Sequence, residues 1–200
     1  MKSPLCRRYD IWTSSLTSWQ REKPGEDFSG VIQAILIGIE MDYIIRAMKE
    51  TEYPLLEDFL YEAIFIPEGV EPPPKSIVNT PELQVYIENF GAQIHDKAMG
   101  AEMNNKVIGA VWVRIMNDYG HIDDETPSFA ISLYKEYRGH GIGTELMKEM
   151  LVILKTCGYK RASLAVQKAN YAVKMYRKVG FEIVGENEEE YIMTARIQEG

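Results

Sequence analysis

Cysteine, histidine and basic residues are scarce in this 200-residue chain, and each shortage excludes a class of protein. Its two cysteines, Cys6 and Cys157, make no disulfide framework, and together with three scattered histidines they offer no metal-ligand spacing. The chain has 30 acidic against 22 basic residues, a net charge of −8, which argues against a general nucleic-acid binder. The composition therefore predicts neither a metal site nor a nucleic-acid partner.

Long apolar runs and an export signal are also missing. The longest apolar run, residues 31–39, is far too short to cross a bilayer. A polar stretch follows the basic N-terminus, where a signal peptide would need its apolar region. Together with the low cysteine content, these absences predict a cytoplasmic protein that has no membrane partner.

What is present is an ordinary globular composition, 46% hydrophobic and 26% charged, which suits one domain with an appendage. Residues 1–40 are interrupted by turn-forming residues, so we expect an N-terminal extension of unclear role there and the domain at 41–200. Within the extension, residues 31–39 suit either a strand or a short buried helix. Met41 is an alternative natural start.

From Tyr43 onward, hydrophobic periodicity predicts strands and helices in the order β-α-α-β-β-β-α-β-α-β-β. This order describes an α/β (α+β) domain in which a mixed sheet is flanked by helices. The expected strands are 43–48, 97–103, 106–115, 129–134, 161–166, 181–185 and 191–197, and the expected helices are 52–65, 80–90, 141–157 and 171–179.

The most informative stretch, residues 138–144, joins the expected strand 129–134 to the expected helix 141–157. Its three glycines remove the Cβ atoms that would keep a ligand away from the backbone. The free amides and the dipole of a helix N-terminus suit an anion there, most naturally a phosphate. A dinucleotide fingerprint would need glycine in place of Leu146, and the Gly-Lys-Ser/Thr of NTPases is absent. From the residues alone, a simple helix-capping turn remains the alternative.

Two segments resemble a known family. Arg138 to Gly143 is similar to the Arg/Gln-x-x-Gly-x-Gly/Ala signature of the GNAT acetyltransferase superfamily. Asn170 to Phe181 is similar to the family's Asn-x-x-Ala/Lys … Tyr-x-Lys-x-Gly-Phe segment, and a helix and a strand separate the two segments as in the family. The resemblance covers roughly residues 41–197.

The resemblance implies a GNAT fold, with a central, mixed, mostly antiparallel twisted sheet that has a V-shaped split between strands 129–134 and 161–166. Acetyl-CoA would lie in this split and no metal would be needed. The amides of 139–144 would hold its pyrophosphate, strand main-chain groups would pair with the pantetheine arm, and Asn170 would contact that arm. The implied cofactor-binding residues are Ile131, Leu133, Arg138, Gly139, His140, Gly141, Ile142, Gly143, Thr144, Asn170 and Tyr176.

The resemblance also implies catalytic roles. Tyr176 matches the family tyrosine that donates a proton to the departing thiolate or hydrogen-bonds the CoA sulfur. Its alternative role is that of a buried aromatic residue on a short amphipathic helix. A backbone N–H near Leu133 would meet the oxyanion.

The base is less well defined, because the strand start, residues 127–129, carries no acid. Glu125 is the nearest upstream candidate, with Asp123 and Asp124 beside it and His121 further off. A solvated acidic loop is an equally good interpretation of these residues. No dedicated base is needed if the amine arrives deprotonated.

We therefore expect an N-acetyltransferase that moves the acetyl group of acetyl-CoA directly to a primary amine of a small molecule, peptide or protein. A catalytically inactive CoA-binding module and a transferase of longer acyl groups are the alternatives, and a homodimer is left open. The acceptor pocket is expected from residues 50–90 and 116–127, with the proline-rich loop 67–74 and Trp112 in its lining, although core packing is the first expectation for Trp112.

Overall fold

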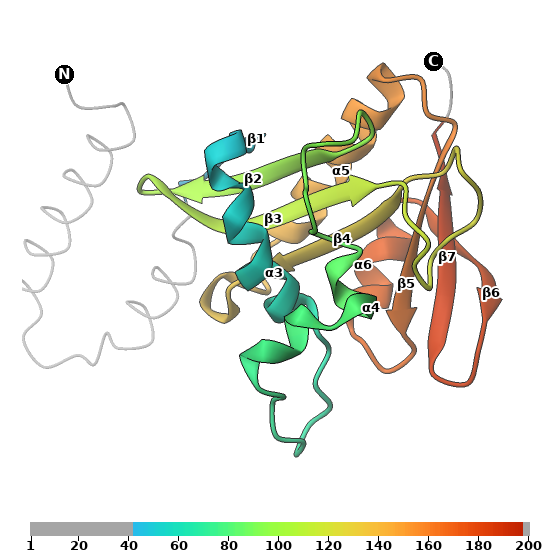
Figure 1. The fold of residues 1–200 in the computed structure, drawn as a ribbon, viewed down its shortest axis with the longest axis horizontal. Coiled ribbons are helices and arrows are strands. Elements are labelled where there is room, and N and C mark those ends of the chain that lie inside the picture. The colour runs from blue at the N-terminus through green and yellow to red at the C-terminus, as the bar shows by residue number, and fades with distance from the viewer. Residues whose placement is uncertain (1–41, 198–200) are drawn as a thin grey trace, which may run out of the picture. The chain divides into compact units, whose positions relative to one another are not determined.

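The computed structural model describes residues 42–197, so the predicted extension and its segment 31–39 lie outside the described residues (Figure 1). Residues 42–197 form a seven-stranded sheet in the order β1-β2-β3-β4-β5-β7-β6. Its strands are β1 (Ile44–Ala47), β2 (Lys97–Met103), β3 (Lys106–Arg114), β4 (Ser128–Leu133), β5 (Arg161–Gln167), β6 (Phe181–Glu186) and β7 (Glu190–Arg196). Neighbouring strands are antiparallel except for β4 and β5, which confirms the mixed, mostly antiparallel sheet.

Helices cover both faces of this sheet. The helices are α3 (Leu56–Ala63), α4 (Pro81–Gln84), α5 (Ile142–Thr156) and α6 (Ala172–Lys178), with 3₁₀ turns η1 (Glu50–Leu55), η2 (Lys75–Asn79) and η3 (Lys135–Tyr137). In Figure 1, α3 lies in front of the first strands and α5 behind them. Phe59 of α3 packs with Trp112 in one core cluster, and the stripe of α5 that includes Leu146 and Met150 is fully buried.

The turn between β2 and β3 confirms one local prediction. Asn104 and Asn105 have φ angles of 51° and 62°, the left-handed conformation that a tight hairpin requires. Asparagine tolerates this region better than other residues with a side chain, so the Asn-Asn pair fixes the register of the hairpin.

The expected helix 80–90 is shorter than predicted, because α4 ends at Gln84. The buried guanidinium of Arg114 donates to the carbonyls of Val85 and Glu88, both at 3.0 Å. Because these two carbonyls accept hydrogen bonds from Arg114 on β3, they do not continue the hydrogen-bond pattern of the helix. The chain after Gln84 therefore continues as a series of turns. Helical periodicity cannot reveal such a competing donor from a distant strand.

Trp112 confirms the first prediction made for it, core packing, and corrects the second, that it lines the acceptor pocket. Its side chain is fully buried on β3, and the indole N–H donates to the carbonyl of Tyr86 at 3.2 Å. Trp112 therefore packs in the core, and it does not line a pocket. A buried indole usually needs an acceptor for its N–H, and the Tyr86 carbonyl is that acceptor for Trp112.

The sheet divides between β4 and β5. These strands are joined at one residue pair, Ser128 with Ser163, and the Ser163 amide donates to the carbonyl of Pro127 at 2.9 Å. Beyond this pair β4 continues to Leu133 with no partner on its β5 side. Figure 1 shows how the strands diverge. β2, β3 and β4 run roughly horizontally across the view, whereas β5, β6 and β7 run roughly vertically. The expected V-shaped split is present, and its apex is at Ser128.

Candidate active site

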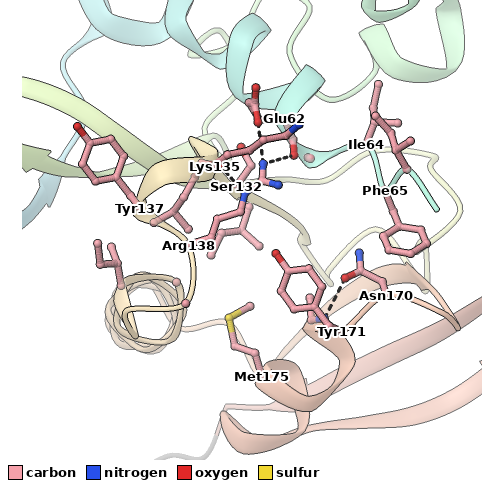
Figure 2. Close-up of a pocket in the computed structure, with 18 of the residues that line it drawn as sticks. Glu62, Ile64, Phe65, Ser132, Lys135, Tyr137, Arg138, Asn170, Tyr171 and Met175 are labelled. Carbon is pink, nitrogen blue, oxygen red and sulfur yellow. Dashed lines mark hydrogen bonds and ion pairs between the residues drawn. The ribbon is translucent and has the colours of Figure 1, made fainter. Parts of the chain in front are cut away.

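A pocket of about 660 Å³ opens in the split between β4 and β5 (Figure 2). Four elements supply its walls: the end of α3 with the segment after it, the second half of β4, the glycine turn before α5, and the start of α6. Ten of the eleven predicted cofactor-binding positions line it: Ile131, Leu133, Arg138, Gly139, Gly141, Ile142, Gly143, Thr144, Asn170 and Tyr176.

The glycine turn presents unoccupied backbone donors to this pocket. Gly139 and Gly141 have φ angles of 82° and 87°, and a Cβ added to either would meet no atom within 4 Å. The amides of Thr144 and Glu145 bond to the Gly141 carbonyl, whereas those of residues 139–143 have no hydrogen-bond partner among the described residues. Free amides at the start of a 15-residue helix form an anion site.

Gly143 is required for a different reason. A Cβ at this position would lie 3.2 Å from the sulfur of Met175 and 3.4 Å from Cδ1 of Leu133. Its absence lets the first turn of α5 approach both β4 and α6. The pocket floor therefore consists of backbone at the point where α5 approaches β4 and α6.

Arg138 does not point its guanidinium at the free amides. Its Nε donates to the Leu133 carbonyl at 2.8 Å, and one terminal nitrogen donates to the carbonyl and the carboxylate of Glu62 at 3.0 and 2.7 Å. Figure 2 shows Arg138 turned toward Glu62 on the far wall. The side chain therefore holds the turn against β4 and α3. The Leu133 carbonyl accepts from Arg138 and is not free to pair with a ligand.

Two residues project into the pocket from the α6 side. The side-chain oxygen of Asn170 accepts the Ala172 amide at 2.9 Å, which leaves its NH₂ group free to donate. Tyr176 is buried against Phe181, with ring centroids 6.2 Å apart. Burial raises the pKa of Tyr176 above its ordinary value, so the phenol stays protonated and can act as a proton donor.

Two predicted site residues lie away from the pocket lining. His140 is exposed between the two pocket glycines, and Glu125 is exposed in the loop between β3 and β4. The Glu125 amide donates to the Asp123 carboxylate, which pairs with Arg161 at 2.6 Å. The geometry therefore gives the proposed role of Glu125 as a base no support.

The sequence predicted one wall from residues 50–90, and the pocket lining includes residues 61–66 of that range together with Val70 and Pro72 of loop 67–74. The second expected segment, residues 116–127, does not line this pocket. Figure 2 shows Ile64 and Phe65 above the pocket, on the side away from Tyr137. The Tyr61 hydroxyl holds this segment by donating to the Pro73 carbonyl at 2.7 Å. The apolar residues Ile64 and Phe65 were the sequence signal for this wall, but they fell within the expected helix 52–65, whereas α3 ends at Ala63.

The residues present suit a ligand that joins an anionic end to an extended arm. The free amides and the open space at Gly139 and Gly141 suit a pyrophosphate. The unpaired edge of β4 suits an extended chain that can pair with main-chain groups. Coenzyme A has both parts, so the pocket fits it.

Comparisons with known proteins agree with this chemistry. The model of the Acetyltransferase (GNAT) family matches residues 63–181, more than half of the chain. The chain therefore belongs to the GNAT acetyltransferase family. No curated protein sequence matches the chain.

Solved structures share the fold. An acetyltransferase of the GNAT family from Streptococcus pneumoniae is 20% identical with a TM-score of 0.57, over 78% of this chain and 100% of that one. PaiA N-acetyltransferase from Thermoplasma acidophilum, in complex with coenzyme A, is 20% identical with a TM-score of 0.59, over 78% and 99%. The ribosomal-protein-S18-alanine N-acetyltransferase from Escherichia coli is 16% identical with a TM-score of 0.57, over 80% and 96%.

Residues 42–197 contain neither a membrane-spanning helix nor a cluster of metal ligands. No helix in this part of the chain is long and apolar enough to span a membrane. The same residues contain no group of three or more His, Cys, Asp or Glu side chains arranged to hold a metal ion.

Proposed function

We propose that the protein transfers the acetyl group of acetyl-CoA directly to a primary amine. The observation that carries this proposal is that one pocket contains both the free amides of residues 139–143 and the phenol of Tyr176. The first group suits the pyrophosphate of the donor, and the second suits a thiolate that leaves as the acetyl group moves. Membership of the GNAT family supports the same reaction.

Each part of the pocket has a role in this proposal. When bound, acetyl-CoA supplies an activated thioester. The glycine turn holds the anionic end, Asn170 donates its NH₂ to the arm, and the β4 edge near Ile131 and Leu133 aligns the arm. The Leu133 N–H faces the developing oxyanion, and Tyr176 donates a proton to the sulfur.

The acceptor would enter between α6 and the apolar wall formed by residues 64–66, Val70 and Pro72. The ribosomal-protein-S18 alanine named for the Escherichia coli structure is an example of a protein acceptor for an enzyme of this fold. A small-molecule amine and a peptide or protein amine are both compatible with the apolar wall. We propose a cytoplasmic enzyme that needs no metal, no nucleic acid and no membrane, and whose homodimerisation is open.

The test combines binding with turnover. Calorimetry should show one CoA bound per chain, and acetyl-CoA should then support amine acetylation faster than butyryl-CoA does. Binding without transfer of any acyl group to an amine panel would identify an inactive CoA module, and faster butyryl transfer would identify a longer-chain acyltransferase. No CoA binding by the folded protein would refute the pocket assignment.

A further inference from the structure

The apolar wall of the pocket stays partly open to solvent. Its five side chains are Ile64, Phe65, Ile66, Val70 and Pro72. The first three are partly buried and the last two are exposed, with Val70 at 55%. Apolar side chains that gather on one side of a pocket and remain in contact with water form a surface on which the apolar part of a ligand can pack.

The polar side chains next to this wall are already hydrogen-bonded within the protein. The hydroxyls of Tyr61 and Ser132 donate to main-chain carbonyls at 2.7 and 2.6 Å. The Glu62 carboxylate accepts from Arg138 at 2.7 Å. A polar group of an acceptor could reach these side chains only by replacing an existing hydrogen bond, which gains little free energy. The wall therefore recognises apolar surface rather than a polar group.

Few charged side chains line the pocket in the described part of the chain, and these are Glu62, Lys135 and Arg138. Glu62 and Arg138 neutralise each other as an ion pair, so Lys135 leaves the lining with positive charge. The two glutamates of loop 67–74 are exposed and do not line the pocket. A second ammonium group on an acceptor would therefore find no unpaired carboxylate in this lining.

Hydrogen bonds and prolines hold the wall in a fixed shape. The Tyr61 hydroxyl bonds to the Pro73 carbonyl, and the Val70 amide donates to the Pro67 carbonyl at 3.2 Å. Three consecutive prolines, residues 72–74, fix the φ angles after this turn. A surface that is ordered before binding loses little conformational entropy when a ligand packs on it.

The wall and the glycine turn approach the split from opposite faces of the sheet. α3, whose end begins the wall, lies in front of the first strands, and α5, which follows the turn, lies behind them (Figure 1). In Figure 2, Ile64 and Phe65 lie on the far side of the pocket from Met175, the residue that approaches Gly143. Direct transfer requires both substrates in the split at once, so the wall on the α3 side faces the acceptor.

We propose that the acceptor is a primary amine carried on an apolar body, with no second charged group near the amine. The alkyl or aromatic part of the acceptor packs on the wall, and Phe65 and Val70 set this specificity. Each methylene buried there should raise kcat/KM roughly fourfold. A terminal ammonium would lose its water without gaining a carboxylate. This inference rests on the proposed acetyl transfer.

Matched amines test this class of acceptor. From propylamine to hexylamine, kcat/KM should rise roughly threefold to fourfold with each methylene, since these amines have nearly equal basicity. 1,4-Diaminobutane, which has an ammonium where pentylamine has a methyl group, should be at least about tenfold poorer than pentylamine. Leucinamide should likewise be a better acceptor than argininamide. In each series that turns over, equal rates or the reverse order would overturn the proposal.

Two variants of the wall, Phe65→Ala and Val70→Glu, test whether it sets this preference. Phe65→Ala should lower kcat/KM for hexylamine about tenfold, while the KM for acetyl-CoA stays within about twofold. Val70→Glu supplies the missing carboxylate at an exposed position, so it should reduce the preference for pentylamine over 1,4-diaminobutane. Val152→Glu, at an exposed valine of α5 outside the pocket, is the matched control and should keep the wild-type preference.

The outcomes separate this inference from the proposed function. An amine preference that is the same in wild type, Phe65→Ala and Val70→Glu would overturn the role of the wall and leave acetyl transfer intact. A changed ratio of butyryl-CoA to acetyl-CoA turnover in Phe65→Ala, with the amine preference unaltered, would show that the wall contacts the acyl group instead. A wild-type protein that acetylates no amine would overturn both proposals.

Discussion

The guanidinium of Arg138 lies 2.7 Å from the carboxylate of Glu62, although 76 positions separate them in the chain. The same side chain also donates to the carbonyls of Leu133 and Glu62. Three walls of the pocket, namely the glycine turn, β4 and the end of α3, therefore meet at one arginine. The cofactor turn is held in place before any ligand binds, which lowers the entropic cost of binding.

Arg138→Ala should both destabilise the fold and weaken CoA binding. It leaves the Leu133 carbonyl and the Glu62 carboxylate without their charged partner, a loss of about 2 kcal/mol for charge-assisted bonds. Urea unfolding and CoA calorimetry measure the two effects. Lys75→Ala, which removes an exposed pair with Asp58, is the control and should leave stability nearly unchanged. Equal effects of the two variants would refute this role of Arg138.

Gly141→Glu should abolish CoA binding, because it places bulk and negative charge at the free amides. Gly158→Glu is a matched control, since Gly158 also has a positive φ, of 84°, and open space, at the other end of α5. Each variant should lose about 1–2 kcal/mol from the left-handed backbone. Calorimetry on the folded proteins should show CoA binding to Gly158→Glu alone, and binding to both would contradict the pyrophosphate assignment.

Tyr176→Phe should lower kcat while CoA affinity stays nearly unchanged, because it removes only the proton that the phenol donates. Since burial raises the pKa of Tyr176, this group should add no basic limb to the pH profile below about pH 10. Tyr171→Phe, at an exposed tyrosine of the same pocket, is the control and should retain turnover. If Tyr176→Phe turns over like wild type, Tyr176 is only a buried aromatic residue.

An ion pair near the sheet edge gives a pH-dependent contribution to stability. Hydrogen bonds from Arg46 hold the pKa of Glu52 at about 2, below its ordinary 4.5. The stabilisation is therefore fully present above pH 4.5 and is lost as the pH falls toward 2. The stability difference between wild type and Glu52→Gln, followed by urea unfolding, should shrink over that range. A constant difference would show that the ion pair contributes nothing.

The sequence predicted the elements that carry a local signal. The helix stripe of α5, the Asn-Asn hairpin and the glycine turn each depend on neighbouring residues, and each is present. The shortened helix at α4 depends on Arg114, a donor from a strand some thirty positions away, which periodicity cannot show. Tertiary contacts of this kind override local propensity.

The site divides in the same way. The pocket glycines and Tyr176 were found because they stand in motifs with fixed spacing. The direction of the Arg138 side chain could not be predicted, because its partner Glu62 lies 76 positions away in the chain.

The most direct test of the account is amine-dependent release of CoA from acetyl-CoA, followed by mass spectrometry of the acceptor. A panel of alkylamines, amino acid amides and peptide N-termini should contain at least one acceptor that gains about 42 Da per CoA released, the mass of one acetyl group less that of the hydrogen it replaces. Gly141→Glu should show no release with that acceptor. CoA release that does not depend on any amine, or no release by protein that binds CoA, would contradict the central claim.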